Sequence, residues 1–294
     1  MKLRQILVTG VAVLGMSATL ASANENEAYT NQKGNHNSAN IKQYDADQKA
    51  GTDVDPLNQE GNDNSISINQ RHFGGAARTV GSTVGLSGDG VDQIGNNNSL
   101  GIAQTNGGGK TIGEAQQIGN SNLIGVSQNG GSLSVLTAIE QIGDSNSARV
   151  VQGGGAGNTV SLVSQVGNNN GGTLVNYDRD EGIFIRQSGN DNLITEASQT
   201  GDNNGGLYYD QGTRIEQTGD MNLASSVTIG DDNNVSILQA GNTNSANIMQ
   251  TGDQSLADIG QTGEDNVATI TQNGFGNIYQ GVQIGTGNSV SVSQ

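Results

Sequence analysis

The segment 216–292 reads as seven consecutive units of eleven residues: EQTGDMNLASS, VTIGDDNNVSI, LQAGNTNSANI, MQTGDQSLADI, GQTGEDNVATI, TQNGFGNIYQG and VQIGTGNSVSV. The second residue of each unit is glutamine, except for Thr228 in the second unit. Glycine follows two residues later in every unit, and asparagine follows five residues later, with Ser255 replacing it once. A fixed period this short predicts a repeat architecture.

Between the asparagine and the next glutamine, polar and apolar residues alternate. In the segment 266–272, one parity carries Asn266, Ala268, Ile270 and Gln272. Side chains of a strand alternate between faces, so these four residue types are expected to share one face. The intervening Q-x-G-x-x-N is typical of a tight turn, because glycine adopts the positive φ that a reversal needs. Each unit therefore predicts one short strand and one tight turn.

Buried glutamine and asparagine need partners, and stacking supplies them. If successive coils lie about 4.8 Å apart, each amide can donate to one neighbour in a column and accept from the other. From Gln93 to Gln165 the glutamines recur every 24 residues, which indicates two strands per coil. The sequence thus predicts an all-β fold, a two-strand-per-coil β-solenoid of amyloid-like character. Counting 23 strand positions from Gln32 to Gln294 predicts about eleven coils and a rod roughly 50 Å long.

The residues expected to carry this architecture are the column amides and the turn glycines. The predicted assembly ladder contains the glutamines Gln93, Gln104, Gln117, Gln128, Gln141, Gln152, Gln165, Gln187, Gln217, Gln239, Gln250, Gln261, Gln272, Gln283 and Gln294. Its asparagines are Asn98, Asn122, Asn146, Asn170, Asn192, Asn222, Asn233, Asn244, Asn266, Asn277 and Asn288. The predicted turn glycines are Gly95, Gly119, Gly143, Gly167, Gly189, Gly219, Gly230, Gly241, Gly252, Gly263, Gly274 and Gly285.

The composition is unusual for a globular protein. The 294 residues include 46 glycines, one proline, three phenylalanines and neither tryptophan nor cysteine, and 32% are hydrophobic. Such a composition alone would suggest disorder, but a solenoid needs only a thin apolar seam in each coil. The absence of cysteine excludes disulfides and cysteine-built metal sites.

The chain divides into four predicted parts. Residues 1–23 resemble a secretory signal peptide, with Lys2 and Arg4 before an apolar run and a small-x-small end. Its removal changes the formal net charge from −16 to −18, and no other segment is apolar enough for a membrane span. Residues 24–30 form a polar leader, 31–92 hold irregular early repeats with loops at 44–58 and 71–90, and 93–294 form the regular solenoid.

The recurring pattern S/N-x-A-x-I-x-Q-x-G-x-x-N resembles the curlin repeat of bacterial curli subunits. The segments 244–261 and 266–283 show it most clearly, and the similarity extends over nearly the whole processed chain. The resemblance implies a secreted subunit of a Gram-negative bacterium that polymerises on the cell surface into curli fibres, or fimbriae, serving cell adhesion and the biofilm matrix. It also implies the chain itself and related curlin subunits as partners, together with an outer-membrane curli secretion pore and periplasmic chaperones. By the same resemblance, 24–30 would target the chain for secretion.

Other chemistry finds little support in the sequence. His36 and His72 lack converging partners, so we expect solvated residues rather than metal ligands or a general base. Acidic turn residues such as Asp231 and Asp253 are open to two interpretations, namely calcium coordination or solubility of an exported chain, and the period of eleven favours the second. The run GGGK ending at Lys110 lacks the spacing of a phosphate loop. Residues 215–294 contain no Lys or Arg, which argues against nucleic-acid binding.

Three classes of function remain open at this stage: a self-assembling structural protein, a monomeric β-solenoid adhesin, and a carbohydrate-active β-helix enzyme. The enzyme is disfavoured, because the recurring residues are amides and glycines rather than paired carboxylates. The strand pattern continues through Ser291–Gln294, which favours a fibre with an open edge over a capped monomer. We therefore expect a fibre subunit with neither catalytic residues nor a cofactor, and the sequence leaves open whether it is a main subunit or a nucleator.

Overall fold

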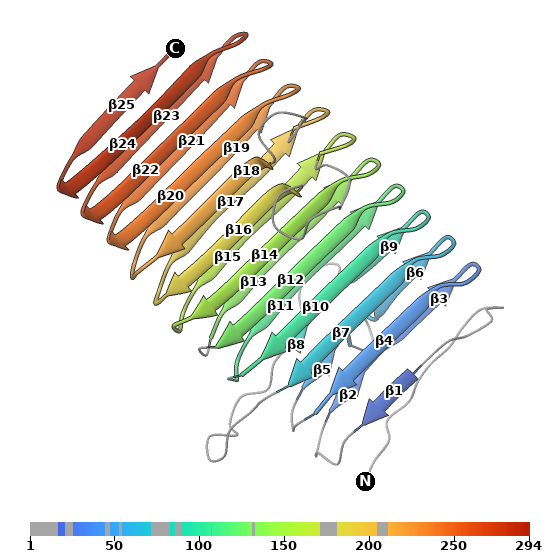
Figure 1. The fold of residues 1–294 in the computed structure, drawn as a ribbon. Coiled ribbons are helices and arrows are strands. Elements are labelled where there is room, and N and C mark those ends of the chain that lie inside the picture. The colour runs from blue at the N-terminus through green and yellow to red at the C-terminus, as the bar shows by residue number, and fades with distance from the viewer. Residues whose placement is uncertain are drawn as a thin grey trace.

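In a computed structural model, the described residues form twenty-five strands, all paired in parallel, and no helix. The strands form two sheets that lie one behind the other in Figure 1 and extend along the same axis. The described residues are 17–20, 26–44, 48–52, 55–71, 83–85, 90–106, 108–130, 133–170, 181–204 and 211–294.

The chain alternates between the two sheets, which we name sheet A and sheet B. Sheet A consists, in spatial order, of β1 (Ser17–Leu20), β4 (Ser38–Gln43), β7 (Ser65–Arg71), β10 (Ser99–Thr105), β12 (Leu123–Gly130), β14 (Ser147–Gly154), β16 (Glu181–Gly189), β18 (Gln211–Thr218), β20 (Asn234–Asn242), β22 (Leu256–Glu264) and β24 (Ile278–Thr286).

Sheet B holds the returning strands. Near the N-terminus each return is split into two short strands, and from β11 onward it is one strand. Its members are β2 (Glu27–Ala28), β3 (Thr30–Lys33), β5 (Lys49–Ala50), β6 (Leu57–Glu60), β8 (Thr83–Val84), β9 (Val91–Ile94), β11 (Thr111–Ile118), β13 (Val135–Ile142), β15 (Thr159–Val166), β17 (Leu193–Thr200), β19 (Leu223–Ile229), β21 (Ser245–Thr251), β23 (Val267–Asn273) and β25 (Ser289–Ser293).

The β-solenoid predicted from the sequence is confirmed, but the predicted eleven coils are too many. The chain makes about nine turns, and nine steps separate β4 from β24 in sheet A. β14 pairs directly with β16 and β16 with β18, so these three strands are immediate neighbours in sheet A although long stretches of sequence separate them. Asn176 is one of the 23 strand positions counted from the sequence, and it lies outside the described residues.

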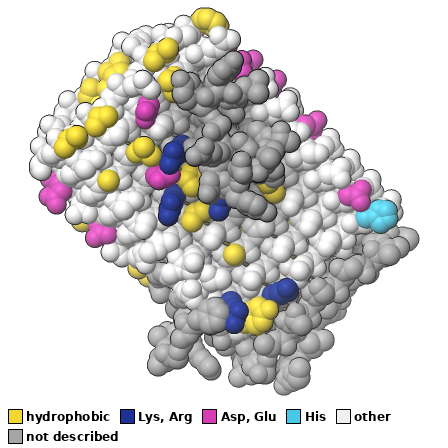
Figure 2. Space-filling model, in the orientation of Figure 1, with side chains coloured by type: hydrophobic (Ala, Val, Ile, Leu, Met, Phe, Trp, Pro, Cys, Tyr) yellow, Lys and Arg dark blue, Asp and Glu magenta, His cyan; other side chains and the backbone are white. Residues whose placement is uncertain are grey.

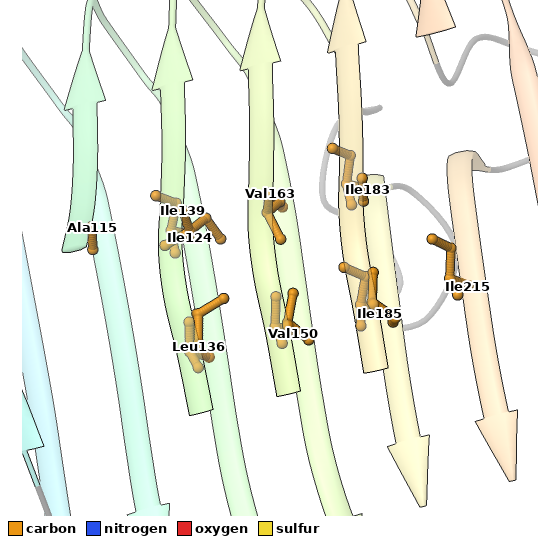
Figure 3. Packing of buried hydrophobic residues seen from close by; sticks show 14 of the residues in the cluster. Ala115, Ile124, Leu136, Ile139, Val150, Val163, Ile183, Ile185 and Ile215 are labelled. Carbon is orange, nitrogen blue, oxygen red and sulfur yellow. The ribbon is translucent and has the colours of Figure 1, made fainter. Parts of the chain in front are cut away.

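The core is the narrow space between the sheets. Alternate residues of each strand point into it, so β21 buries Ala246, Ile248 and Gln250. In Figure 3, side chains such as Ile139 and Val163 of sheet B and Val150 of sheet A come from successive strands and meet between the two sheets. Because each layer contributes only a few aliphatic groups, the core lengthens with every turn rather than thickening.

The other parity of each strand faces outward. One face of the rod, seen in Figure 2, combines scattered apolar side chains with a few Lys and Arg, while Asp and Glu gather towards its margins. Those margins are the turns between strands, which carry residues such as Asp231, Asp253 and Asp220.

The expected signal peptide, residues 1–23, falls largely on residues 1–16 and 21–23, which lie outside the described residues. Its segment 17–20 forms β1, whose backbone pairs with β4. If 1–23 is removed on export, β4 becomes the outermost strand of sheet A.

Candidate assembly site

A column of ten glutamines runs through sheet A from β4 to β24. Each side-chain Nε2 donates to Oε1 of the glutamine one turn further toward the C-terminus, at 2.8–3.0 Å in all nine steps. The members are Gln43, Gln70, Gln104, Gln128, Gln152, Gln187, Gln217, Gln239, Gln261 and Gln283. All ten side chains are buried, so the column is a polar seam inside the core.

The same amides also hold the two sheets together. Gln239 Nε2, for example, donates to Gln261 Oε1 at 2.9 Å and to the carbonyl oxygen of Leu223, at the start of β19, at 3.0 Å. Gln261 repeats this with Ser245 O at 3.0 Å. Each of these buried amides donates two hydrogen bonds and accepts one. An apolar residue at the same position would leave the neighbouring amides and the backbone carbonyl oxygen without these hydrogen bonds.

Sheet B has a matching column that is interrupted once. Gln32, Gln59, Gln93, Gln117, Gln141, Gln165 and Gln199 form one run, and Gln250, Gln272 and Gln294 form another. Thr228 stands between the runs, and its hydroxyl is buried without a partner, as is Oε1 of Gln250. The threonine side chain is too short to bridge neighbouring turns, which explains the break.

Asparagines line both edges of the solenoid, where the chain leaves a turn and enters a strand. Asn244 Nδ2 donates to Gly263 O of the next turn at 2.9 Å, and its Oδ1 accepts the backbone N–H of Asn266 at 3.2 Å. The predicted residues Asn98, Asn122, Asn146, Asn170, Asn233 and Asn277 lie at turns into sheet A, and Asn192, Asn222, Asn244, Asn266 and Asn288 at turns into sheet B. Ser255 cannot reproduce this bridge, and its hydroxyl is buried without a partner.

The predicted turn glycines all have positive φ, between 108° and 131°. A second constraint is their close stacking. A Cβ built on Gly241 would lie 2.0 Å from Gly263 O, far inside van der Waals contact, and the neighbouring turns repeat this arrangement. Glycine is therefore required both by the backbone conformation and by the spacing of the coils.

Several members of the columns were missed by the sequence analysis. The pattern Q-x-G-x-x-N also occurs at Gln199, Gly201 and Asn204, and Gln199 belongs to the sheet B column. These residues do not follow the 24-residue spacing, because a long segment of sequence precedes β16. The early repeats also contribute fully, through Gln32, Gln43, Gln59, Gln70, Asn37 and Asn64. Asn158 was missed because it stands six positions after Gln152, whereas the predicted asparagines stand five positions after the preceding glutamine position.

Lys110 takes a place in an asparagine column. Strand register places Ser134, Asn158 and Asn192 at the equivalent position of the three following turns. The side chain of Lys110 is fully buried. Its Nζ donates to Asn106 O at 2.7 Å and to Gly130 O at 3.1 Å. Burial lowers the pKa of Lys110 from 10.5 to about 8.

Aspartates in the turns have a structural role that the sequence analysis did not assign. Asp144 Oδ1 accepts the backbone N–H of Asn120 at 2.7 Å, and Asp231 Oδ1 accepts that of Asp202 at the same distance. Asparagines occupy the same position in other turns, for example Asn120 Oδ1 for Asn96 N–H. Within the described residues, no group of three or more His, Cys, Asp or Glu is placed to hold a metal ion.

The fold and the four amide columns define a parallel β-solenoid built from stacked strand–turn units. Residues 230–263 match the family model of the curlin associated repeat. This segment holds β20, β21 and most of β22, and it therefore includes Gln239, Gln250 and Gln261 of the columns. The resemblance to the curlin repeat is thus confirmed over these residues. No curated protein matches the chain in sequence. Together, the repeat and the solenoid fit a curli-type structural protein.

Proposed function

We propose that the chain is a structural subunit of an extracellular curli-type amyloid fibre, and that it assembles by stacking the edge strands of one copy on those of the next. The adhesive and matrix roles, a secretion pore and chaperones as export partners, and the absence of catalysis are part of this proposal. They rest on the curlin repeat rather than on contacts of this chain. Within the described residues, no helix is long and apolar enough to cross a bilayer.

The observation that carries the proposal is the direction of the glutamine column. Every Nε2 of sheet A donates toward the C-terminal side, so the column has an accepting end and a donating end. At the accepting end, the Oε1 atoms of Gln43 and Gln32 are buried without partners. At the donating end, Gln283 Nε2 contacts Val267 O but no further glutamine.

These two ends complement each other. A second copy whose β4 stacks on β24 would place Gln43 Oε1 where Gln283 Nε2 can donate to it, and the column would continue unbroken. Like ends cannot do this, because two accepting or two donating amides would face each other. The proposal therefore requires head-to-tail stacking.

Dilution of the processed chain from denaturant tests this function. We expect fibres in electron micrographs, a rise in thioflavin fluorescence, and fibre diffraction at about 4.7 Å and about 10 Å. Persistence of a discrete monomeric solenoid at concentrations that seed other amyloids would contradict it and would favour the monomeric adhesin.

A further inference from the structure

Sheet B extends half a turn beyond sheet A at each end of the processed rod. At the N-terminal end, β2 and β3 form one rung of sheet B, residues 26–33, which we call the first rung, and the chain passes from it into β4 of sheet A. At the C-terminal end, the chain passes from β24 of sheet A into β25 of sheet B (Figure 1). Once residues 1–23 are removed, each end therefore presents a strand of sheet B that lies half a turn outside the outermost strand of sheet A.

These two outer rungs compete for one position in the proposed fibre. When β4 of one copy stacks on β24 of another, the first rung of the former and β25 of the latter both fall at the one position of sheet B between these two strands. Neighbouring strands lie about 4.8 Å apart, which leaves room for a single strand there. Keeping both rungs would hold β4 and β24 about 10 Å apart, beyond the reach of backbone hydrogen bonds and of a hydrogen bond from Gln283 to Gln43. One of the two rungs must therefore leave this position.

The first rung is interrupted, whereas β25 is continuous. β2 has two residues and β3 has four, with Tyr29 between them, while β25 has five residues in a row. In the first rung, Nδ2 of Asn26 and Oε1 of Gln32 are buried without hydrogen-bond partners. Such atoms destabilise the position that buries them, and release of the first rung into water hydrates both.

The ion pairs of the first rung do not anchor it firmly. Lys33 pairs with Glu60, and Glu27 pairs with Lys49 at 3.4 Å. All four side chains are a third or more exposed. Ion pairs that are this accessible to water contribute little to stability.

β25 also carries the more apolar inward side chains. The first rung directs Ala28 and Thr30 towards the core, next to β5 and β6. At the equivalent places β25 carries Val290 and Val292, which are half-buried against the end of the core in the single chain. Valines in place of Ala28 and Thr30 would bury more apolar surface, which favours β25 as the rung that stays.

We propose that two copies of this chain join by strand exchange, in which β25 of one copy takes the place of the first rung of the next and pairs with its β5 and β6. The first rung is released into solvent, and β4 can then stack on β24. This inference rests on the proposed fibre, because it describes the joint that head-to-tail stacking creates. Both glutamine columns cross this joint: Gln283 donates to Gln43, and Gln294 takes the place of Gln32 as the donor to Gln59.

The repeat fixes the register of the exchange. The inward parity of the segment 26–32 carries Asn, Ala, Thr and Gln, and that of the segment 288–294 carries Asn, Val, Val and Gln. Aligning the two final glutamines places Ser289 at the position of Glu27, whose Cα partner in β5 is Lys49. After the exchange, Ser289 of one copy therefore neighbours Lys49 of the next on the outer face of sheet B.

Cysteine cross-linking tests this register, because the sequence contains no cysteine of its own. Chains that carry both Ser289→Cys and Lys49→Cys are grown into fibres under reducing conditions, oxidised, and run on a denaturing gel. Positions 289 and 49 lie at opposite ends of one rod, so a disulfide between them joins two copies. We expect the monomer band to be lost to a ladder of covalent multimers, because neighbouring strands lie within the reach of a disulfide.

Two further pairs of cysteines are the controls. Ser289→Cys with Ser164→Cys, on the outer face of β15, reports contacts between the sides of fibres and should stay monomeric. Ser289→Cys with Glu27→Cys reports a joint in which both outer rungs are kept and stack on each other. The exchange is overturned if the pair with Glu27→Cys forms as many multimers as the pair with Lys49→Cys, or if the latter forms no more than the pair with Ser164→Cys.

A disulfide that holds the first rung in place provides the second test. Glu27→Cys with Lys49→Cys places two cysteines on neighbouring strands of one chain, and the oxidised form cannot release the first rung. We expect the thioflavin fluorescence of this oxidised variant, seeded with wild-type fibres, to stay at the level of the seeds, and reduction to restore growth. Asn247→Cys with Thr269→Cys is the matched control, since it joins β21 to β23 on the same outer face away from both outer rungs, and its oxidised form should elongate normally.

The two failures are distinguishable. Elongation of the oxidised Glu27→Cys and Lys49→Cys variant at the rate of its control overturns the exchange and leaves the fibre function intact. Absence of wild-type fibres from electron micrographs overturns the fibre function, and the exchange with it.

Discussion

Replacing Gln239 by glutamate removes two hydrogen bonds from the centre of the sheet A column. A carboxylate still accepts from Gln217 Nε2 at 2.9 Å, but it donates to neither Gln261 Oε1 nor Leu223 O. Two lost hydrogen bonds cost about 1 kcal/mol each, and the buried charge adds at least ~1 kcal/mol. We expect the free energy of unfolding of the solenoid to fall by about 3 kcal/mol at pH 7.

The loss should depend on pH in a defined direction. Burial among carbonyl oxygens raises the pKa of a glutamate at position 239 above its value of ~4.3 in an unfolded chain. The charge penalty is therefore absent below ~pH 4, grows as the pH rises, and levels off above the folded-state pKa. Ala240→Glu is the control, because the neighbouring side chain is exposed on the outer face.

Urea unfolding followed by circular dichroism measures both variants at pH 4 and pH 7. If Gln239→Glu and Ala240→Glu lower the urea midpoint equally at pH 7, the buried amide column does not stabilise the fold in the way described.

Three further outcomes follow from single positions. Thr228→Gln should raise the free energy of unfolding by about 1 kcal/mol, because it joins the two glutamine runs of sheet B and supplies a donor to Gln250 Oε1; an unchanged urea midpoint would contradict this. Gly241→Ala should prevent refolding at 37 °C, as judged by circular dichroism, because the added Cβ would clash with the next turn. Gly276 has open space around it and only a positive φ, so Gly276→Ala should lower the free energy of unfolding by about 1 kcal/mol. Equal effects of the two variants would refute the stacking constraint. The free energy of unfolding should rise as the pH increases from about 8 towards 10.5, because Lys110 loses its proton in the folded state before it does so in the unfolded chain. Urea titrations at several pH values measure this rise, and Lys110→Met should abolish it.

The parity of the repeat made much of the fold predictable. Because Asn266, Ala268, Ile270 and Gln272 recur with a fixed period, only one register buries all four types, and the structure buries them together. The turn glycines were equally predictable, since the pattern places them where the chain must reverse.

Positions that depend on length or on chemical substitution were harder to predict. Gln199 belongs to the sheet B column, but the long segment before β16 means that Gln199 does not follow the 24-residue spacing of the preceding glutamines. Lys110 has no resemblance to asparagine, yet its long side chain reaches two carbonyl oxygens from the same place in the column. The direction in which the glutamines donate depends on the orientation of each amide, which the sequence does not encode separately for each turn.

In the proposed fibre, the glutamine column continues from one chain into the next. A mixing experiment with wild-type seeds, wild-type chain and a substoichiometric amount of Gln283→Glu tests it directly, with Gln280→Glu as the control on the outer face of the same strand. A Gln283→Glu chain can add through its Gln43 end but then presents no donor, so we expect it to stop fibre growth at pH 7 and to do so less near pH 4. Gln280→Glu should be incorporated and allow growth to continue. Equal effects of the two variants on fibre length would show that the chains are not joined through the amide column.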